Sequence, residues 1–233
     1  MKYYIIDYDL NFKIVGSDYP QSWQFTKEYE KRKKNSNAVY ALLECGDNLN
    51  KPNFIPDLDG FVLSGRAKQT NFISTSVFSR LFMDEHAKNV LQSKCNLGNY
   101  EFYEAVLYVK KVPISYYYLE TFFNIIPYIK FSDCVYYLEY IRDGDKIPEE
   151  WINSGFNDCE TVLSIDKYFP NRLIGVRFQT LVLKKDFDKD LDWFVIDKFG
   201  VHNGICSERF KDAVEEAGLT GLVFEPIEVE VEE

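Results

Sequence analysis

Residue types that commonly carry catalysis are sparse in this chain. It has only two histidines, His86 and His202, among 233 residues. His86 lies in the segment DEHAKN, which lacks the HExxH spacing of a zinc protease helix, so we interpret it as a surface histidine. His202 precedes Cys206 by four residues in FGVHNGICSER, but a cysteine nucleophile with a histidine base also needs a shared cleft and a third, orienting group. We therefore interpret this segment as a turn without a catalytic role.

Sequence motifs for phosphate binding and for serine hydrolases are missing as well. The chain has no GxGxxG after an expected strand, no GxxxxGK[ST] and no GxSxG. Paired carboxylates remain an alternative, because 37 acidic residues offer many pairs and the sequence does not show which of them are buried. We predict no catalytic residue and no cofactor, and we keep a hydrolase using buried carboxylates as the alternative.

The segment DFDKDLDWFVID, residues 186–197, imitates the start of a calcium loop. Its alternating carboxylates are Asp186, Asp188, Asp190 and Asp192. A calcium loop needs glycine at its sharp turn and a bidentate glutamate at its end, where this chain has Leu191 and Asp197. We therefore predict no metal site. The segment is expected to be an exposed acidic turn, or an acidic contact surface for a basic partner.

Negative charge is concentrated near the end of the chain. The net charge is −10, and residues 203–233 hold nine acidic residues against Arg209 and Lys211. Nucleic acids and anionic membranes are bound through basic patches, so neither is an expected partner. A basic protein partner fits better.

Cysteine usage and hydropathy indicate the compartment. Five cysteines are scattered without a CxxC pair, and no secretory signal precedes them. No apolar run approaches the roughly 18 residues of a membrane helix. We expect a soluble cytoplasmic protein.

Residues 207–231 form the clearest structural unit in the sequence. Ser207 is suited to cap a helix whose apolar face is Phe210, Ala213, Val214 and Ala217. Gly218 then suits the left-handed position that ends a helix. Alternation from Gly221 predicts a strand whose acidic outer face includes Glu225, Glu228 and Glu230, and Pro226 would place that strand at an edge or a bulge.

The remaining patterns predict an α+β fold with mixed, mainly antiparallel sheets and a few packed helices. We expect strands at residues 2–7 and 38–44, helices over about 21–34 and 76–92, and a long surface loop over 46–60. Residues 1–233 are expected to form one domain, with 1–60 a candidate N-terminal subdomain and 61–233 the remaining region. Tyrosine-rich strands, including Tyr116 to Tyr118, are expected to pack in a sheet or to form an interface.

The segment SERFKDAVEEAGLTGLVFEPI resembles the C-terminal signature of a family of bacterial immunity proteins from polymorphic toxin systems. This family was formerly a domain of unknown function associated with myxobacterial members. The resemblance extends over about residues 61–230 and is strongest in the last 25. NIIPYIKFSDC, residues 124–134, resembles the family's central strand motif, with Asp133 at its aspartate.

This resemblance implies inhibition of a cognate toxin domain by binding, without a reaction. It implies no catalytic residues. The first candidates for partner contact are Asp186, Asp188, Asp190 and Asp192, and the second are Glu225, Glu228 and Glu230. A regulatory module with another partner is the third interpretation.

Overall fold

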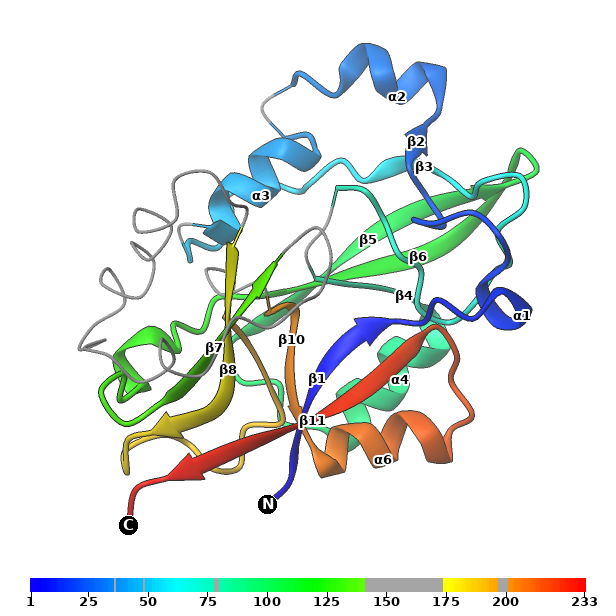
Figure 1. The fold of residues 1–233 in the computed structure, drawn as a ribbon. Coiled ribbons are helices and arrows are strands. Elements are labelled where there is room, and N and C mark those ends of the chain that lie inside the picture. Colours follow the sequence, from blue (N-terminus) through cyan, green and yellow to red (C-terminus); the bar gives the residue numbers. More distant parts are fainter. Residues whose placement is uncertain (36, 48, 78–79, 141–173, 197–200) are drawn as a thin grey trace.

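The structure is a computed structural model that describes residues 1–35, 37–47, 49–77, 80–140, 174–196 and 201–233. In these residues the strands form two sheets (Figure 1). The first sheet has the order β7-β8-β11-β1-β10-β9. Its strands are β1 (Tyr3–Tyr8), β7 (Val135–Tyr140), β8 (Ile174–Leu183), β9 (Trp193–Ile196), β10 (Val201–Ser207) and β11 (Leu222–Val231). Only β11 and β8 pair in parallel there.

The second sheet has the order β2-β3-β5-β6-β4. Its strands are β2 (Gln24–Phe25), β3 (Asp59–Val62), β4 (Leu81–Asp84), β5 (Tyr100–Val109) and β6 (Val112–Thr121). A long hairpin of β5 and β6 forms the centre of this sheet. The pairing of β3 with β5 is parallel, and the other strand pairings given for this sheet are antiparallel. The two mixed, mainly antiparallel sheets confirm the predicted α+β class.

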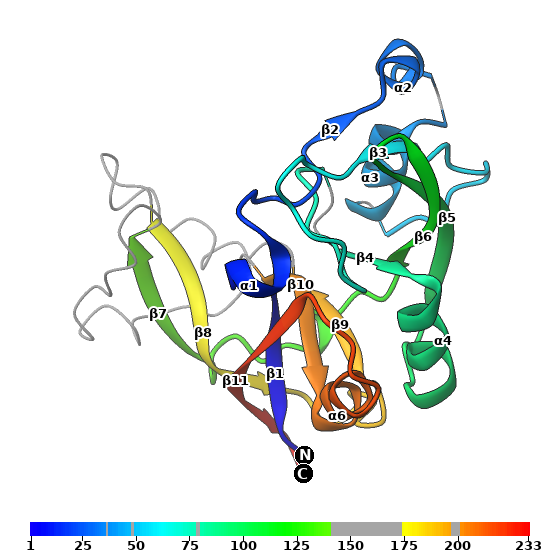
Figure 2. The ribbon, with the colours of Figure 1, turned by 90° about the vertical axis from the view of Figure 1, so that its right-hand side faces the viewer.

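Helices cover the sheets on two sides. α4 (Glu85–Lys94) and α6 (Glu208–Glu216) lie side by side and complete a central core between the sheets (Figure 2). α2 (Lys27–Arg32) and α3 (Val39–Asp47) contribute side chains to a second core on the opposite face of the second sheet. A third core lies under β7, β8 and the short helix η1 (Ile126–Tyr128). α1 (Phe12–Val15) follows β1. None of the described helices is long and apolar enough to span a membrane.

The α6 unit has the geometry that its sequence predicts. The Ser207 hydroxyl accepts a hydrogen bond from the Phe210 N–H at 3.2 Å. Gly218, at φ 64°, donates to the Glu215 carbonyl, and Leu219 donates to the Val214 carbonyl. These two bonds are the paired contacts of a Schellman motif. Phe210 and Val214 are buried, so the predicted apolar face is confirmed.

Three secondary-structure predictions were wrong, and a fourth was too long: the helix expected over residues 21–34 covers only Lys27–Arg32, because Thr26 caps it after strand β2. Residues 39–44 lie in helix α3, because Val39 and Leu42 pack on the second sheet with helical spacing while Tyr40 is exposed. The helix expected over 76–92 starts only at Glu85, after β4, since Asp84 caps it by accepting from the Ala87 N–H.

The third error concerns the expected turn around Gly204, which lies inside β10. The pairing of β10 with β9 shifts register between Val201 and Ile205. Gly204 has φ 106°, and a Cβ there would lie 2.3 Å from Nε1 of Trp193. The glycine therefore marks an irregularity within a strand.

Candidate functional site

The four predicted aspartates lie on the loop between β8 and β9, and three of them are exposed. Asp186, Asp188 and Asp190 are exposed, whereas Phe187 between them is buried in the third core. Asp188 accepts a hydrogen bond from the Asp190 N–H at 3.0 Å. The buried Phe187 side chain therefore anchors the loop to the third core. It also carries Lys184, Lys185 and Lys189, so its three carboxylates are balanced by three ammonium groups.

Asp192 is not on the surface, which corrects the expectation that all four aspartates are available to a partner. Its exposed fraction is 0%. Its carboxylate accepts hydrogen bonds from the Ser207 hydroxyl, the Asn96 N–H at 2.7 Å and Nε of Arg209 at 2.8 Å. A buried carboxylate needs such partners, and here they join β9 to the start of α6.

The three predicted glutamates lie on β11 but do not share one face. Glu225 is on the same face as Ile227, which packs in the third core, and Glu228 and Glu230 are on the opposite face. Glu228 accepts from the Thr180 hydroxyl at 2.8 Å. All three are exposed. The expected single acidic face is therefore corrected to two faces.

Pro226 lies in an interior strand, not at the edge of the sheet as expected. It pairs with Tyr4 of β1, while the pairing with β8 starts at Glu228. In the described part of the chain, no strand therefore adjoins Pro226 on its second side. An interior strand tolerates proline where its missing N–H has no partner to bond.

The remaining predicted groups also have defined places. His86 is exposed on α4. Cys206 is buried, and burial raises the pKa of its thiol, which disfavours the nucleophilic thiolate. Tyr116 and Tyr118 are fully buried, so packing and not an interface explains them. The described residues contain no group of His, Cys, Asp and Glu that could hold a metal ion.

Glu120 is a buried carboxylate of the kind that the hydrolase alternative requires. Oε1 accepts from Nε of Arg80 at 2.8 Å and from the Thr121 N–H, and Oε2 accepts from the Tyr118 hydroxyl at 2.7 Å. Burial raises the pKa of Glu120, while Arg80 and Tyr118 oppose that rise. Both oxygens have partners, as expected of a structural ion pair.

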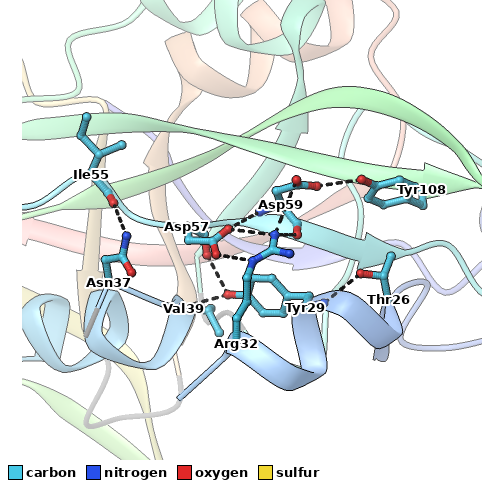
Figure 3. Close-up of polar contacts among 9 residues, drawn as sticks. All are labelled: Thr26, Tyr29, Arg32, Asn37, Val39, Ile55, Asp57, Asp59 and Tyr108. Atoms are coloured by element: carbon cyan, nitrogen blue, oxygen red, sulfur yellow. Dashed lines mark hydrogen bonds and ion pairs between the residues drawn. The ribbon is translucent and has the colours of Figure 1, made fainter. Parts of the chain in front are cut away.

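A polar network that sequence analysis did not anticipate joins α2 to the segment before β3 (Figure 3). Nε of Arg32 donates to the Asp57 carboxylate at 2.7 Å, and the guanidinium also donates to the Asp59 carbonyl at 2.8 Å. The Tyr108 hydroxyl of β5 donates to the Asp59 carboxylate at 2.9 Å. Asp57 and Asp59 lie within the expected loop 46–60. Their spacing after Pro56 was the only sequence signal for this network.

Next to this network is a groove of about 600 Å³. One wall is the segment Ile55–Asp59, and the other is formed by β5 and β6, including Phe102, Glu104 and Tyr117. The size falls within the range of about 300–1,000 Å³ that is typical of ligand sites. A second hollow, which is more open, lies beside α6.

Comparison with known protein families finds a match for one part of the chain. The model of an immunity protein family (Imm11) matches residues 159–229, which include β8, β9, β10, α6 and β11. The predicted resemblance to an immunity protein family is confirmed for this part. No curated protein matches the chain.

Asp133 lies outside the matched range. Its segment forms a turn after η1, not the expected strand, because the Asp133 N–H donates to the Lys130 carbonyl at 3.0 Å and closes the turn.

Proposed function

We propose that this protein is a bacterial immunity protein that binds and inhibits a cognate toxin domain without catalysing a reaction. The observation that carries the proposal is the family match over residues 159–229. The net charge of −10 supports a basic toxin domain as partner, since complementary charge raises association rates. The protein would act in the cytoplasm as part of a polymorphic toxin system, with no metal or cofactor.

The proposed contact surface draws on exposed acidic residues inside the matched range and on Glu230 directly after it. Asp186, Asp188 and Asp190 remain the first candidates, and Glu225, Glu228 and Glu230 the second. Asp192 is left out because it is buried and bonded to Arg209. The loop is suited to recognition because buried Phe187 and Leu191 fix its shape before a partner arrives.

The test compares association rates for the toxin domain encoded beside this gene. The triple variant Asp186→Asn, Asp188→Asn, Asp190→Asn should associate more slowly, with a weaker dependence on ionic strength, and dissociation should change less. Stopped-flow mixing at several salt concentrations measures both rates.

A control variant with the opposite expected effect sharpens this test. Replacing Lys185 and Lys189 by Gln makes the same loop more acidic, so association should become faster. Equal rates for wild type, the triple variant and this control would remove the loop from the contact surface. Failure of the wild-type protein to bind or inhibit the toxin would reject the proposed function itself.

A further inference from the structure

The edge of β5 is only partly covered. β3 pairs with β5 at Val106 to Tyr108, where the Val106 N–H donates to the Leu58 carbonyl. Successive backbone groups of a strand alternate between its two sides. The N–H and C=O groups of Phe102 and Glu104 therefore point to the same side as those of Val106. Among the described residues, none pairs with them on that side.

The groove of about 600 Å³ lies at this uncovered edge. Its opposite wall, Ile55–Asp57, is fixed by contacts to the helices (Figure 3). Arg32 bonds the Asp57 carboxylate, the Tyr29 hydroxyl donates to the Asp57 carbonyl at 2.7 Å, and the Asn37 amide donates to the Ile55 carbonyl. The gap is therefore preformed by fixed side chains.

The chemistry of the groove favours a basic, partly apolar occupant. Its described lining includes the carboxylates of Asp57, Asp59 and Glu104 and no lysine or arginine. Arg32 is bonded to both aspartates, whereas Glu104 is exposed and has no ion pair within the described residues. Ile55 is 88% exposed at the rim. The buried hydroxyl of Tyr103, which also lines the groove, has no hydrogen-bond partner in the described part of the chain.

We propose that the groove receives an extended, basic segment of the toxin, which adds as a strand to the free edge of β5. The inference rests on the proposed function and specifies its contact. The backbone of the added strand would pair with Phe102 and Glu104, and its lysine or arginine side chains would face Glu104. Strand addition of this kind derives affinity from the backbone and specificity from alternate side chains.

The first experiment uses a defined probe, an eight-residue peptide of alternating Val and Lys, with the full-length protein. Amide hydrogen exchange, followed residue by residue by NMR, should show slower exchange at Phe102 and Glu104 when this peptide is added. The same peptide N-methylated at every backbone amide, which removes its donors on both edges, should give no protection. A peptide of alternating Val and Glu should bind at least about tenfold more weakly. Unchanged exchange at both amides with saturating Val-Lys peptide would overturn the inference.

The second experiment uses two matched charge reversals. Glu104→Lys should weaken binding of the Val-Lys peptide by at least about tenfold, because like charges then face each other. Asp212→Lys, on the exposed side of α6 and outside the groove, should leave peptide binding unchanged. A thermal melt of each variant checks that the fold is retained. Equal effects of the two substitutions would overturn the inference, as would a dimer joined through β5, which ultracentrifugation would detect.

The toxin domain separates this inference from the proposed function. If wild type inhibits the toxin and Glu104→Lys does not, the groove is the contact. If both inhibit equally well, the groove inference is wrong while the proposed function stands. If wild type does not inhibit, the proposed function fails, and the peptide experiment alone decides whether the groove accepts a basic strand.

Discussion

At the scale of single residues, burial separates side chains that the sequence shows as equivalent. Asp186 and Asp192 belong to the same alternating run, yet the first is exposed and the second is completely buried. No local pattern distinguishes them, because the partners of Asp192 are Asn96 and Arg209, which are distant in the sequence. The exposure of the candidate contact residues was therefore less predictable than the fold.

This difference predicts that replacing Asp by Ala changes the free energy of unfolding strongly at one position and little at the other. Asp192→Ala removes a carboxylate that bonds Ser207, Asn96 and Arg209, so the free energy of unfolding should fall by at least about 2 kcal/mol. Asp186→Ala removes an exposed side chain and should change it by less than about 0.5 kcal/mol. Urea denaturation measures both. Equal losses would show that Asp192 is not the structural link described above.

Tyr29 gives a prediction for alkaline pH. Its buried hydroxyl donates to the Asp57 carbonyl and accepts from the Val39 N–H, and burial raises the pKa of Tyr29 from 10.0 to about 12. Because the folded-state pKa is the higher one, the native state holds this proton more tightly. The stabilisation is complete below pH 10 and is lost as the pH rises from 10 through 12.

The variant Tyr29→Phe tests this prediction. It should reduce stability at pH 7 by about 1–3 kcal/mol, since the Val39 N–H loses its partner. Its stability should also decline less steeply than that of wild type between pH 10 and 12. Urea denaturation at several pH values measures the slope, and identical slopes for the two proteins would contradict the assigned pKa.

At the scale of elements, prediction from sequence succeeded where local chemistry decides the structure. The cap at Ser207, the apolar face of α6 and the glycine at its end are all set within about twelve residues, and all three are confirmed. It failed at α3, where β-branched and aromatic residues suggested a strand but packing on the second sheet favours a helix. It also failed at Gly204, whose role depends on the approach of Trp193.

The α6 face makes a quantitative prediction. Phe210 is fully buried in the central core, so Phe210→Ala should reduce the free energy of unfolding by about 3–5 kcal/mol. Phe12→Ala is the matched control, because Phe12 is 69% exposed, and it should cost less than about 0.5 kcal/mol. Thermal and urea melts measure both variants. A small loss for Phe210→Ala would mean that α6 does not support the core.

At the scale of the whole molecule, the ends of the chain are joined in one sheet. β1 lies between β10 and β11 and pairs with both. The region matched by the immunity family therefore has a strand from outside the match inserted between two of its own strands. Residues 1–60 also supply β2, α2 and α3 beside the second sheet. One domain over 1–233, with residues 1–60 as a candidate N-terminal subdomain, stays a prediction.

Removal of β1 tests that prediction. Deletion of residues 1–10 exposes the facing edges of β10 and β11 and takes Ile6 and Tyr8 out of the central core. The shortened protein should lose cooperative unfolding, because a split sheet leaves unpaired backbone groups and an incomplete core. A synthetic peptide of residues 1–10, added in trans, should restore the melt in proportion to its concentration. The same peptide with Ile6→Asp should not restore it, since a charged group would then enter the core. If the shortened protein melts like the full chain without any peptide, residues 11–233 fold without β1, and the prediction of one domain that includes the first strand is wrong.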